Sequence, residues 1–405
     1  MIRSLIILDS LPYPPRGGQQ LRYRQAIDAL LPLGPVTLLL LADARQADIL
    51  DEAVPPVLRL DPQVPRSWHY RWARLLGPLG KAAWRARLRR RHQAALQNVI
   101  AHHLAEIAPD LVLVESAELM TCLPPLAAPG RRVVYDAHNV ERRLWGELVP
   151  LRGRLGGAPA KAGYGQRIVA GEAALLRSAD QVWACSEEDA LQFAQAYPAP
   201  LPSLRVIPNT VDTGAFAAIA AARAARRRDG PPMLLLTAHF GYAPNVEAAR
   251  FLLDSVRPAL MATIGPVRLV LCGRQPPPEL LAAAAHDAEI VVTGEVADVR
   301  PWLAAADIAV APLRTGSGTR LKILEAMAAA CPVVSTGKGA EGLAVVDGEH
   351  LLLADEAGAF VAALRRCLDQ PAEAMAMAMR GNALVERLYS WTANRARVRA
   401  ALETG

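Results

Sequence analysis

Short apolar runs alternate, along the first half of the chain, with segments whose apolar residues recur at helical spacing. Runs of strand length lie at 4–9, 36–41, 111–115, 132–136, 180–186 and 204–207. Between the first two runs, Leu21, Ile27, Leu30 and Leu31 follow a helical period. Apolar runs without polar alternation are typical of strands covered on both faces, as in a parallel sheet. The pattern therefore predicts a doubly wound α/β domain.

The same pattern starts again in the second half. Strand-length runs lie at 233–237, 267–272, 289–292, 308–311 and 333–335, with helical segments between them. A turn-forming Pro/Asn/Asp cluster at 208–212 precedes an Ala/Arg stretch, which ends at 226–230 and which we interpret as a solvated linker. We predict two Rossmann-like domains, over 1–212 and 213–387, that face a central cleft. The last helix, about 388–405, is expected to cross back to the first domain.

Composition limits the class of protein. Of the 405 residues, 52% are hydrophobic and 21% are charged, which excludes a mainly disordered chain. No apolar stretch reaches the roughly 18–20 residues of a membrane-spanning helix, and the N-terminus does not have the pattern of a signal peptide. We therefore expect a cytoplasmic protein. Widely spaced cysteines without histidine partners predict buried free thiols and no zinc site. They are Cys122, Cys185, Cys272, Cys331 and Cys367.

The net charge of +6 conceals one strongly basic segment, 62–105, which contains no Asp or Glu. Its cations are Arg66, Arg71, Arg74, Lys81, Arg85, Arg87, Arg89, Arg90 and Arg91. Trp68, Tyr70, Trp72 and Trp84 lie among them. Because aromatic side chains mixed with cations are typical of interfacial segments, we expect contact with an anionic membrane surface. A solvated basic helix with inward-facing tryptophans and a docking site for an anionic acceptor are the alternatives. The chain shows no nucleic-acid-binding module, so nucleic acid is not an expected partner.

The most informative segment runs from Pro312 to Ala328. A strand ends there, a loop containing Gly316, Ser317, Gly318 and Thr319 follows, and a helix is predicted to begin near the end of that loop. Backbone N–H groups at a helix start bind anions, and the positive end of the helix dipole strengthens the site.

Charged side chains follow in the first turns of this predicted helix. Arg320 and Lys322 supply two cations suited to a diphosphate. Glu325 comes three residues after Lys322 and so shares its helix face. A ribose diol would give this carboxylate two hydrogen bonds. The alternative is a Lys322–Glu325 surface ion pair beside glycines that only make a turn.

Other strand ends also carry polar or flexible residues. Gly17 and Gly18 follow the first strand and permit close approach of a ligand, although a plain turn is an equal alternative. His138 and Asn139 follow the strand at 132–136, where α/β folds bind ligands, and Asp136 or Glu141 would orient the histidine. A purely structural role of this single histidine is the alternative. The loops that contain Gly294 and Val296, and 337–342, could equally be binding loops or turns.

Together these segments resemble the retaining glycosyltransferases of the GT-B fold, family 4 type. The motifs that carry the resemblance are Gly17-Gly18 and the segments 135–141, 207–212 and 316–328. The chain is similar in particular to the sugar transferases associated with bacterial exosortase (PEP-CTERM) polysaccharide systems. Those proteins contain blocks like the ones at 244–246, 316–327 and 339–343.

The resemblance implies transfer of a sugar from a nucleotide-diphosphate donor to a glycan or lipid-linked acceptor, with retention and without a metal or other cofactor. It implies that the work is done in the cytoplasm, at the inner face of the cell membrane, in polysaccharide synthesis. The implied catalytic residues are His138, Arg320 and Lys322. The implied donor-binding residues are Gly17, Gly18, Asn245, Gly294, Val296, Ser317, Gly318, Thr319, Arg320, Lys322 and Glu325.

The sequence departs from the family pattern in two places. Ser317 stands where the first of two motif glutamates is usual, and His239-Phe240-Gly241-Tyr242 replaces a usual Arg and Lys. The first departure leaves the selectivity for the donor sugar open, and the second assigns the diphosphate to Arg320 and Lys322. Two other functions remain as alternatives: a nucleotide-sugar epimerase of the same shape, and an inactive scaffold that only binds sugar nucleotides.

Overall fold

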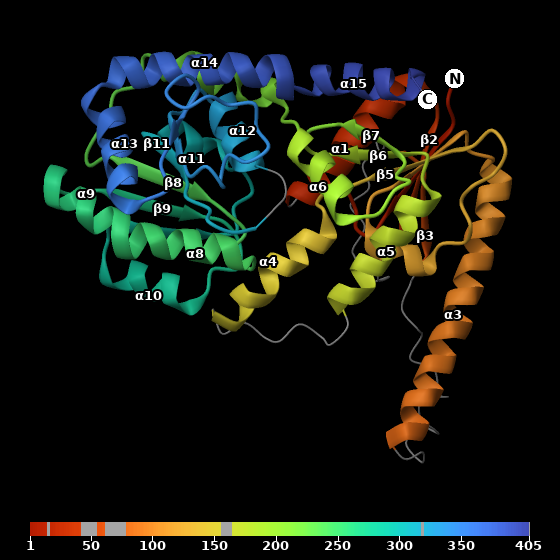
Figure 1. Ribbon diagram of the computed structural model, residues 1–405. Coiled ribbons are helices and arrows are strands. Elements are labelled where there is room, and N and C mark those ends of the chain that lie inside the picture. Colours follow the sequence, from red (N-terminus) through yellow and green to blue (C-terminus); the bar gives the residue numbers. More distant parts are fainter. Residues whose placement is uncertain (14–16, 42–54, 61–77, 155–163, 317–319, 405) are drawn as a thin grey trace. The chain divides into compact units, whose positions relative to one another are not determined.

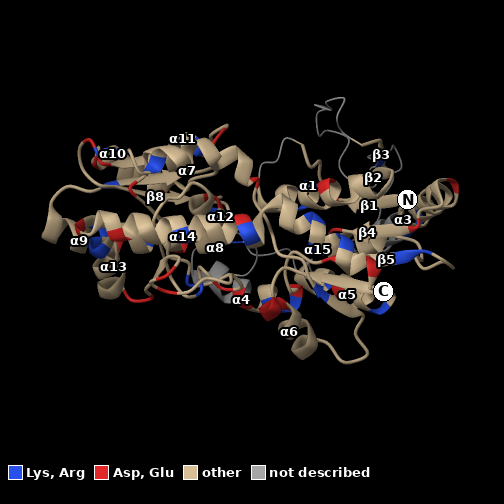
Figure 2. Ribbon diagram, turned by 90° about the horizontal axis from the view of Figure 1, so that it is seen from above, with Lys and Arg blue, Asp and Glu red and all other residues tan. Residues whose placement is uncertain are grey.

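The computed structural model describes residues 1–13, 17–41, 55–60, 78–154, 164–316 and 320–404 (Figure 1). The chain forms two compact units. The first unit comprises Met1–Glu141, Lys161–Ala184 and Gln192–Val206. The second comprises Arg142–Ala160, Cys185–Leu191 and Ile207–Gly405. Figure 2 shows the charged residues mainly on helices and connecting loops, as expected for sheets whose strands are apolar.

The first unit is built on a seven-stranded sheet in the order β3-β2-β1-β4-β5-β6-β7. All of its strand pairs are parallel. The strands are β1 (Ser4–Leu8), β2 (Val36–Leu41), β3 (Val57–Leu60), β4 (Leu111–Val114), β5 (Arg132–Asp136), β6 (Gln181–Ala184) and β7 (Ser203–Val206). Ile6 pairs with Leu38 on one side and Leu113 on the other, and all three side chains are fully buried. The predicted doubly wound parallel sheet is confirmed.

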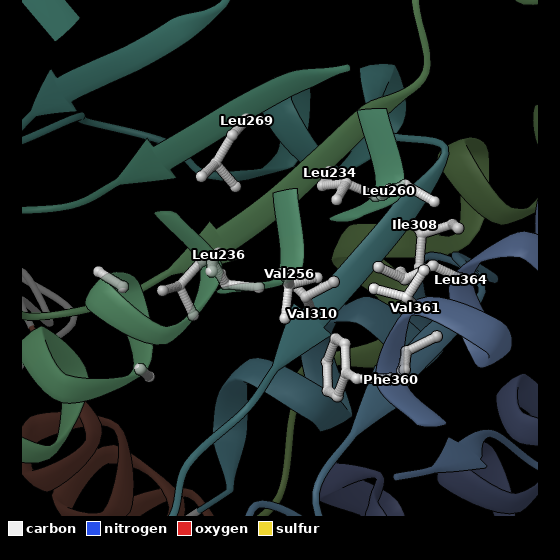
Figure 3. Close-up of a cluster of buried hydrophobic side chains, with 14 of the residues drawn as sticks. Leu234, Leu236, Val256, Leu260, Leu269, Ile308, Val310, Phe360, Val361 and Leu364 are labelled. Carbon is white, nitrogen blue, oxygen red and sulfur yellow. The ribbon is translucent and has the colours of Figure 1, made fainter. Parts of the chain in front are cut away.

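The second unit contains a six-stranded sheet in the order β10-β9-β8-β11-β12-β13, again with parallel pairs. The strands are β8 (Met233–Thr237), β9 (Arg268–Cys272), β10 (Ile290–Gly294), β11 (Ile308–Ala311), β12 (Val333–Ser335) and β13 (Leu352–Leu353). Leu234, Leu236 and Val310 of this sheet pack with Phe360 and Leu364 into a continuous apolar cluster (Figure 3). This cluster is the core of the unit.

Helices connect the strands of both sheets (Figure 1). They are α1 (Gly18–Leu30), α3 (Pro78–Ile107), α4 (Glu141–Arg154), α5 (Tyr164–Ser178), α6 (Glu187–Ala196), α7 (Ala217–Arg223), α8 (Ala243–Phe251), α9 (Arg257–Ile264), α10 (Pro278–His286), α11 (Arg300–Ala305), α12 (Leu321–Ala328), α13 (Ala357–Asp369), α14 (Pro371–Tyr389) and α15 (Trp391–Glu403). Shorter turns are η1 (Leu31–Leu33), η3 (Ala117–Cys122), η4 (Thr213–Phe216) and η5 (Leu252–Val256). No helix among the described residues is both long and apolar enough to cross a bilayer.

Several local expectations need correction. The sequence pattern did not indicate β3 or β13, which are short strands at the edges of their sheets. The final helical region breaks at Gln370 as well as at Ser390, because Pro371 begins a new helix. The cysteines are free thiols, as predicted, but Cys122 is only partly buried.

The Ala/Arg stretch before the second sheet is not a simple solvated linker. It contains α7, and the side chain of Arg223 at the end of that helix is 4% exposed. Its guanidinium donates to the carbonyl oxygens of Leu303 (2.6 Å) and Ala306 (2.7 Å). These bonds satisfy carbonyl groups at the end of α11 that would otherwise be buried without partners.

Replacement of Arg223 by Met should therefore lower the free energy of unfolding by about 1–3 kcal/mol, because the buried carbonyl oxygens lose their donors. Urea unfolding followed by circular dichroism measures this change. The exposed neighbour Arg227 offers a matched control, and Arg227→Met should change stability by less than about 0.5 kcal/mol. Equal effects of the two substitutions would show that the Arg223 contacts contribute nothing.

Candidate functional site

The strand order of the second unit defines where a ligand would bind. From β8 the chain continues to β9 and β10 on one side, whereas β11, β12 and β13 lie on the other. In doubly wound sheets, ligands bind outside the carboxyl ends of the strands at such a reversal. The loops that follow β8 and β11 therefore lie together at this position. Their described residues include 238–242 and 312–316.

Gly316 brings these two loops into contact. Its φ of +91° lies in the left-handed region, and a Cβ added there would lie 2.6 Å from the Tyr242 hydroxyl and 3.0 Å from Pro244. Only glycine combines this backbone conformation with so close an approach. The loop after β11 thus rests against the segment that replaces the usual Arg and Lys of the resembled family.

Arg320 caps the start of α12 and is buried, with 6% of its side chain exposed. One terminal nitrogen donates to Oε2 of Glu341 over 3.1 Å. Among the described residues, Nε has no hydrogen-bond partner. Burial lowers the pKa of this guanidinium, although Glu341 raises it. A buried donor without an acceptor is destabilising, so this arrangement favours binding of an anion.

Lys322 lies in the first turn of α12 and connects three segments. Its Nζ donates to Oδ1 of Asn245 over 2.7 Å, and Nδ2 of Asn245 donates to the carbonyl oxygen of His239 over 2.8 Å. Burial lowers the pKa of Lys322 to about 7, and the positive charge of Arg320 contributes. Burial raises the pKa of Glu325, on the same helix face, to about 7, although Lys322 opposes this shift.

The predicted alternative of a Lys322–Glu325 surface pair does not describe this arrangement. In the described part of the second unit, Lys322 is bonded to an amide oxygen and forms no ion pair with Glu325. The pKa values of both groups lie near neutral pH. Such a pair can respond to a bound anion by taking up or releasing a proton.

Two carboxylates balance the cations around α12. Glu341 accepts from Arg320, from Lys338 (2.7 Å) and from Arg143 (3.0 Å). Burial raises the pKa of Glu341, but these cations hold it below its usual value. Glu147 accepts from the backbone N–H of Gly316 over 3.1 Å. The backbone N–H of this loop therefore already binds a carboxylate, as expected of an anion site.

The other predicted donor-binding residues lie farther from the strand reversal of the second unit or outside the described residues. Gly294 ends β10, two strands from the reversal, with a φ of +68° and open space where a Cβ would be. Val296 follows it and is partly exposed. Ser317, Gly318 and Thr319 lie outside the described residues. No three His, Cys, Asp or Glu side chains in the described ranges converge in a way that could hold a metal ion.

The first unit has its own reversal, between β1 and β4. Gly17 is the extended residue before α1, and Gly18 is the first residue of that helix. Asp9, Glu115 and Asp136 follow or end the neighbouring strands β1, β4 and β5. Carboxylates from three adjacent strands therefore gather at one edge of the sheet, and two of them are almost fully buried.

Hydrogen bonds organise this edge. Nε of Arg22 donates to Oδ1 of Asp136 over 2.9 Å, and both side chains are buried. Nε2 of His138 lies 3.2 Å from Oε2 of Glu115. The Tyr23 hydroxyl donates to Oδ1 of Asp9 over 2.7 Å, which fixes the tyrosine ring edge-on against His138.

Burial shifts the acid–base properties of this cluster. It raises the pKa of Glu115 to about 8 and that of Asp136 to about 7, although the positive charge of Arg22 lowers both. It lowers the pKa of His138 to about 4, and Arg22 adds to this decrease. His138 is therefore neutral at neutral pH, and at least one of the buried carboxyl groups holds a proton.

Sequence reasoning missed Glu115 and Arg22. In the sequence, Glu115 indicates only the end of a strand, and Arg22 lies between Leu21 and Tyr23, on the buried side of α1. The available signal was a charged residue at a strand end and another on an apolar helix face. Neither position predicts its partner, because Arg22 and Asp136 are 114 residues apart.

Comparison with solved structures identifies the fold. Sucrose-phosphate synthase from Thermosynechococcus elongatus superposes with a TM-score of 0.69 at 19% identity, over 99% of this chain and 98% of that one. Anabaena HepE in complex with UDP-glucose superposes with a TM-score of 0.67 at 18% identity, over the full length of both chains. Two Rossmann-like units that match these proteins define the GT-B fold.

Comparison of sequences adds the enzyme class. Residues 231–370 match the family model described as glycosyl transferases group 1. The D-inositol 3-phosphate glycosyltransferase of Acidothermus cellulolyticus is 30% identical over 226 residues, which are 51% of this chain and 49% of that protein. The chain thus spans about half the length of this curated relative. The family model and the relative name the same class, the glycosyltransferases.

Proposed function

We propose that the chain is a glycosyltransferase that moves a sugar from a nucleotide-diphosphate donor to a glycan or lipid-linked acceptor. The observation that carries the proposal is the group formed by Arg320, Lys322 and Glu325 at the strand reversal of the second unit. There, a buried guanidinium has a nitrogen without a partner among the described residues. The match of residues 231–370 to glycosyl transferases supports the proposal, as does the UDP-glucose in HepE, which shares the fold.

The donor would bind along the second unit in three parts. Arg320, Lys322 and the loop 316–319 would hold the diphosphate, with Asn245 orienting the lysine. Glu325 would accept hydrogen bonds from the ribose diol. Gly294 and Val296 would present backbone groups to the nucleobase. In the first unit, we propose that Gly17, Gly18 and His138 contact the sugar substrates.

The reaction would proceed by loss of the nucleoside diphosphate. The bond between the anomeric carbon and the phosphate oxygen breaks, the acceptor oxygen bonds to the same carbon, and the acceptor proton passes to a phosphate oxygen. Entry and departure on one face give retention of configuration. Negative charge grows on the diphosphate, so Arg320 and Lys322 stabilise the transition state more than the bound donor. These cations would make a metal ion unnecessary.

The pathway is part of the same proposal. The blocks at 244–246, 316–327 and 339–343 support a role in bacterial polysaccharide synthesis of the exosortase-associated type. A lipid-linked acceptor would place the enzyme at the inner face of the cell membrane.

Incubation with a panel of nucleotide sugars, with and without candidate acceptors, tests the function. We expect product only when both substrates are present, and an unchanged anomeric configuration by NMR. Interconversion of sugar epimers without an acceptor would instead identify an epimerase. Binding without any turnover over the whole panel would identify a scaffold, for which Ser317 in place of the usual glutamate is the favouring feature.

Glu325→Ala should weaken binding of the preferred nucleoside diphosphate about 10- to 100-fold, because hydrogen bonds to a charged group contribute roughly 1.5–3 kcal/mol. Isothermal titration calorimetry measures this directly. The matched control is Glu386→Ala, since Glu386 is exposed on α14. Unchanged affinity in a folded Glu325→Ala protein would overturn the ribose assignment.

Arg320→Gln and Lys322→Met should each lower kcat about 100- to 1,000-fold, because loss of a group that stabilises developing charge has effects of this size. The KM for the acceptor should change little, and Arg228→Gln, at an exposed position, should behave as the wild type. If both site variants changed only the acceptor KM, the diphosphate would bind elsewhere.

We also propose that the basic segment 62–105 contacts an anionic membrane surface. Most of its cations and all of its tryptophans lie outside the described side chains. The described part supplies Arg90 and Arg91, both exposed on α3, which extends well beyond its sheet (Figure 1). Leu96, Ile100 and Leu104 of the same helix are buried and anchor its C-terminal half. The helix therefore exposes Arg90 and Arg91, while its C-terminal half is packed against the first unit.

Co-sedimentation with liposomes tests this contact. Binding should increase with the fraction of anionic lipid and decrease with salt, because exposed charges are screened. Replacement of Trp68, Trp72 and the arginines at 89–91 should abolish it. Arg90→Ser with Arg91→Ser is the more conservative variant. Arg227→Ser with Arg228→Ser removes the same charge from an exposed site elsewhere and should bind normally. Equal losses in the two double variants would indicate a general charge effect and contradict the assignment.

A further inference from the structure

Glu115 and His138 meet at the strand reversal of the first unit. Strands β4 and β5 pair in register, with Val114 opposite Tyr135, so the residues that follow the two strands are neighbours. Oε2 of Glu115 lies 3.2 Å from Nε2 of His138. The Glu115 side chain is fully buried, and its other oxygen, Oε1, has no hydrogen-bond partner among the described residues.

Charged and titratable groups of the described residues face Glu115 from β5, from α1 and from the end of β1. Asp136 ends β5, Arg22 and Tyr23 lie on α1, and Asp9 follows β1. Arg22 donates to Asp136 through Nε (2.9 Å) and Nη2. In the described part of the chain, no cation donates to Glu115. Asp136 is therefore the carboxylate stabilised by the guanidinium, and Glu115 is the group left to hold a proton.

The position of that proton follows from the available acceptors. Burial raises the pKa of Glu115 to about 8; Arg22 and Asp136 lower it, and the negative charge of Asp9 raises it further. His138 is neutral, because burial lowers its pKa to about 4, so one ring nitrogen carries a lone pair. Within the described residues, Nε2 of His138 is the ring nitrogen that can accept this proton, and Asp136, the other carboxyl group beside Glu115, already accepts from Arg22.

We propose that Glu115 is a positioning residue: its protonated carboxyl group donates to Nε2 of His138 and thereby places the ring hydrogen on Nδ1. The Tyr23 ring is nearly perpendicular to the imidazole, with the two ring centroids 5.4 Å apart, and holds the imidazole in the same orientation. When Glu115 ionises, its carboxylate accepts from Nε2–H instead. The ring hydrogen then moves from Nδ1 to Nε2, and Nδ1 changes from a donor to an acceptor.

The inference rests on the proposed function in one respect, the contact between His138 and a sugar substrate. If His138 makes that contact, the tautomer decides whether Nδ1 donates a hydrogen bond to a sugar oxygen or accepts one from a sugar hydroxyl. Glu115 then affects the reaction only through His138. Turnover at saturating donor should therefore fall as pH rises through the ionisation of Glu115.

Nitrogen-15 NMR of the full chain, labelled on histidine, measures the tautomer without any turnover. A His138→Gln spectrum assigns the His138 signals. At pH 6.5 we expect the shifts of a ring protonated on Nδ1, and a change to the Nε2–H form with a midpoint near pH 8. In Glu115→Gln this midpoint should disappear. In Glu118→Gln, a control on η3, it should remain. An Nε2–H ring at pH 6.5, or a midpoint that persists in Glu115→Gln, would overturn the proposal.

Kinetics then separates this inference from the proposed function. Glu115→Gln should keep kcat within about two-fold at pH 6.5 and lose the alkaline decrease, because an amide still donates to Nε2. Glu115→Ala should lower kcat at least ten-fold at all pH values, with an unchanged KM for the donor. NMR behaviour as expected, with no alkaline decrease in wild-type turnover, would refute the sugar contact of His138 and leave the tautomer assignment standing. Poor folding of Glu115→Ala would not affect the NMR result, which depends on the wild type and the Gln variant.

Discussion

Burial of charge at the carboxyl ends of parallel strands is the constraint on which both candidate sites depend. A parallel sheet covered by helices leaves only its ends open, so chemically useful side chains gather there. Removal of a charge from water is unfavourable unless the charge is paired or neutralised. In the first unit, Arg22 and Asp136 pair, and Glu115 holds a proton. In the second unit, Arg320 finds a carboxylate partner, while Lys322 makes its hydrogen bond to an amide oxygen.

Buried charge is balanced differently at the strand reversals of the two sheets. The cluster of the first unit is acidic and closed, and its buried groups already satisfy one another, with one carboxyl oxygen as the exception. The site of the second unit is cationic and incomplete. Its guanidinium keeps an unpartnered nitrogen among the described residues, and its lysine has a pKa of about 7 without a bound anion. A diphosphate would supply the missing negative charge, and this is the physical basis of the proposed donor site.

The sequence predicted most strands of both sheets because fully buried parallel strands are continuous apolar runs, as at 36–41 and 111–114. It did not indicate β3, which has only four residues and includes the polar Arg59 at an edge of the sheet. The loop and helix around α12 were also recognised, because Gly316, Arg320, Lys322 and Glu325 are close in the sequence. Interaction partners that are distant in the sequence were not predicted. Asn245 lies 77 residues before Lys322, and Glu115 lies 23 residues before His138. Local patterns identify a charged residue but not the group that balances its charge.

The central claim is that a nucleoside diphosphate completes the charge balance around Lys322. Because the pKa of Lys322 is about 7 without ligand, the amine is mostly neutral at pH 8, and a bound anion should restore its proton. Calorimetric titration with the preferred nucleoside diphosphate at pH 8, in buffers of different ionisation enthalpy, measures this uptake. The account predicts uptake of most of one proton per ligand bound, and its loss in Lys322→Met. Binding without proton uptake, or uptake that persists in Lys322→Met, would contradict it.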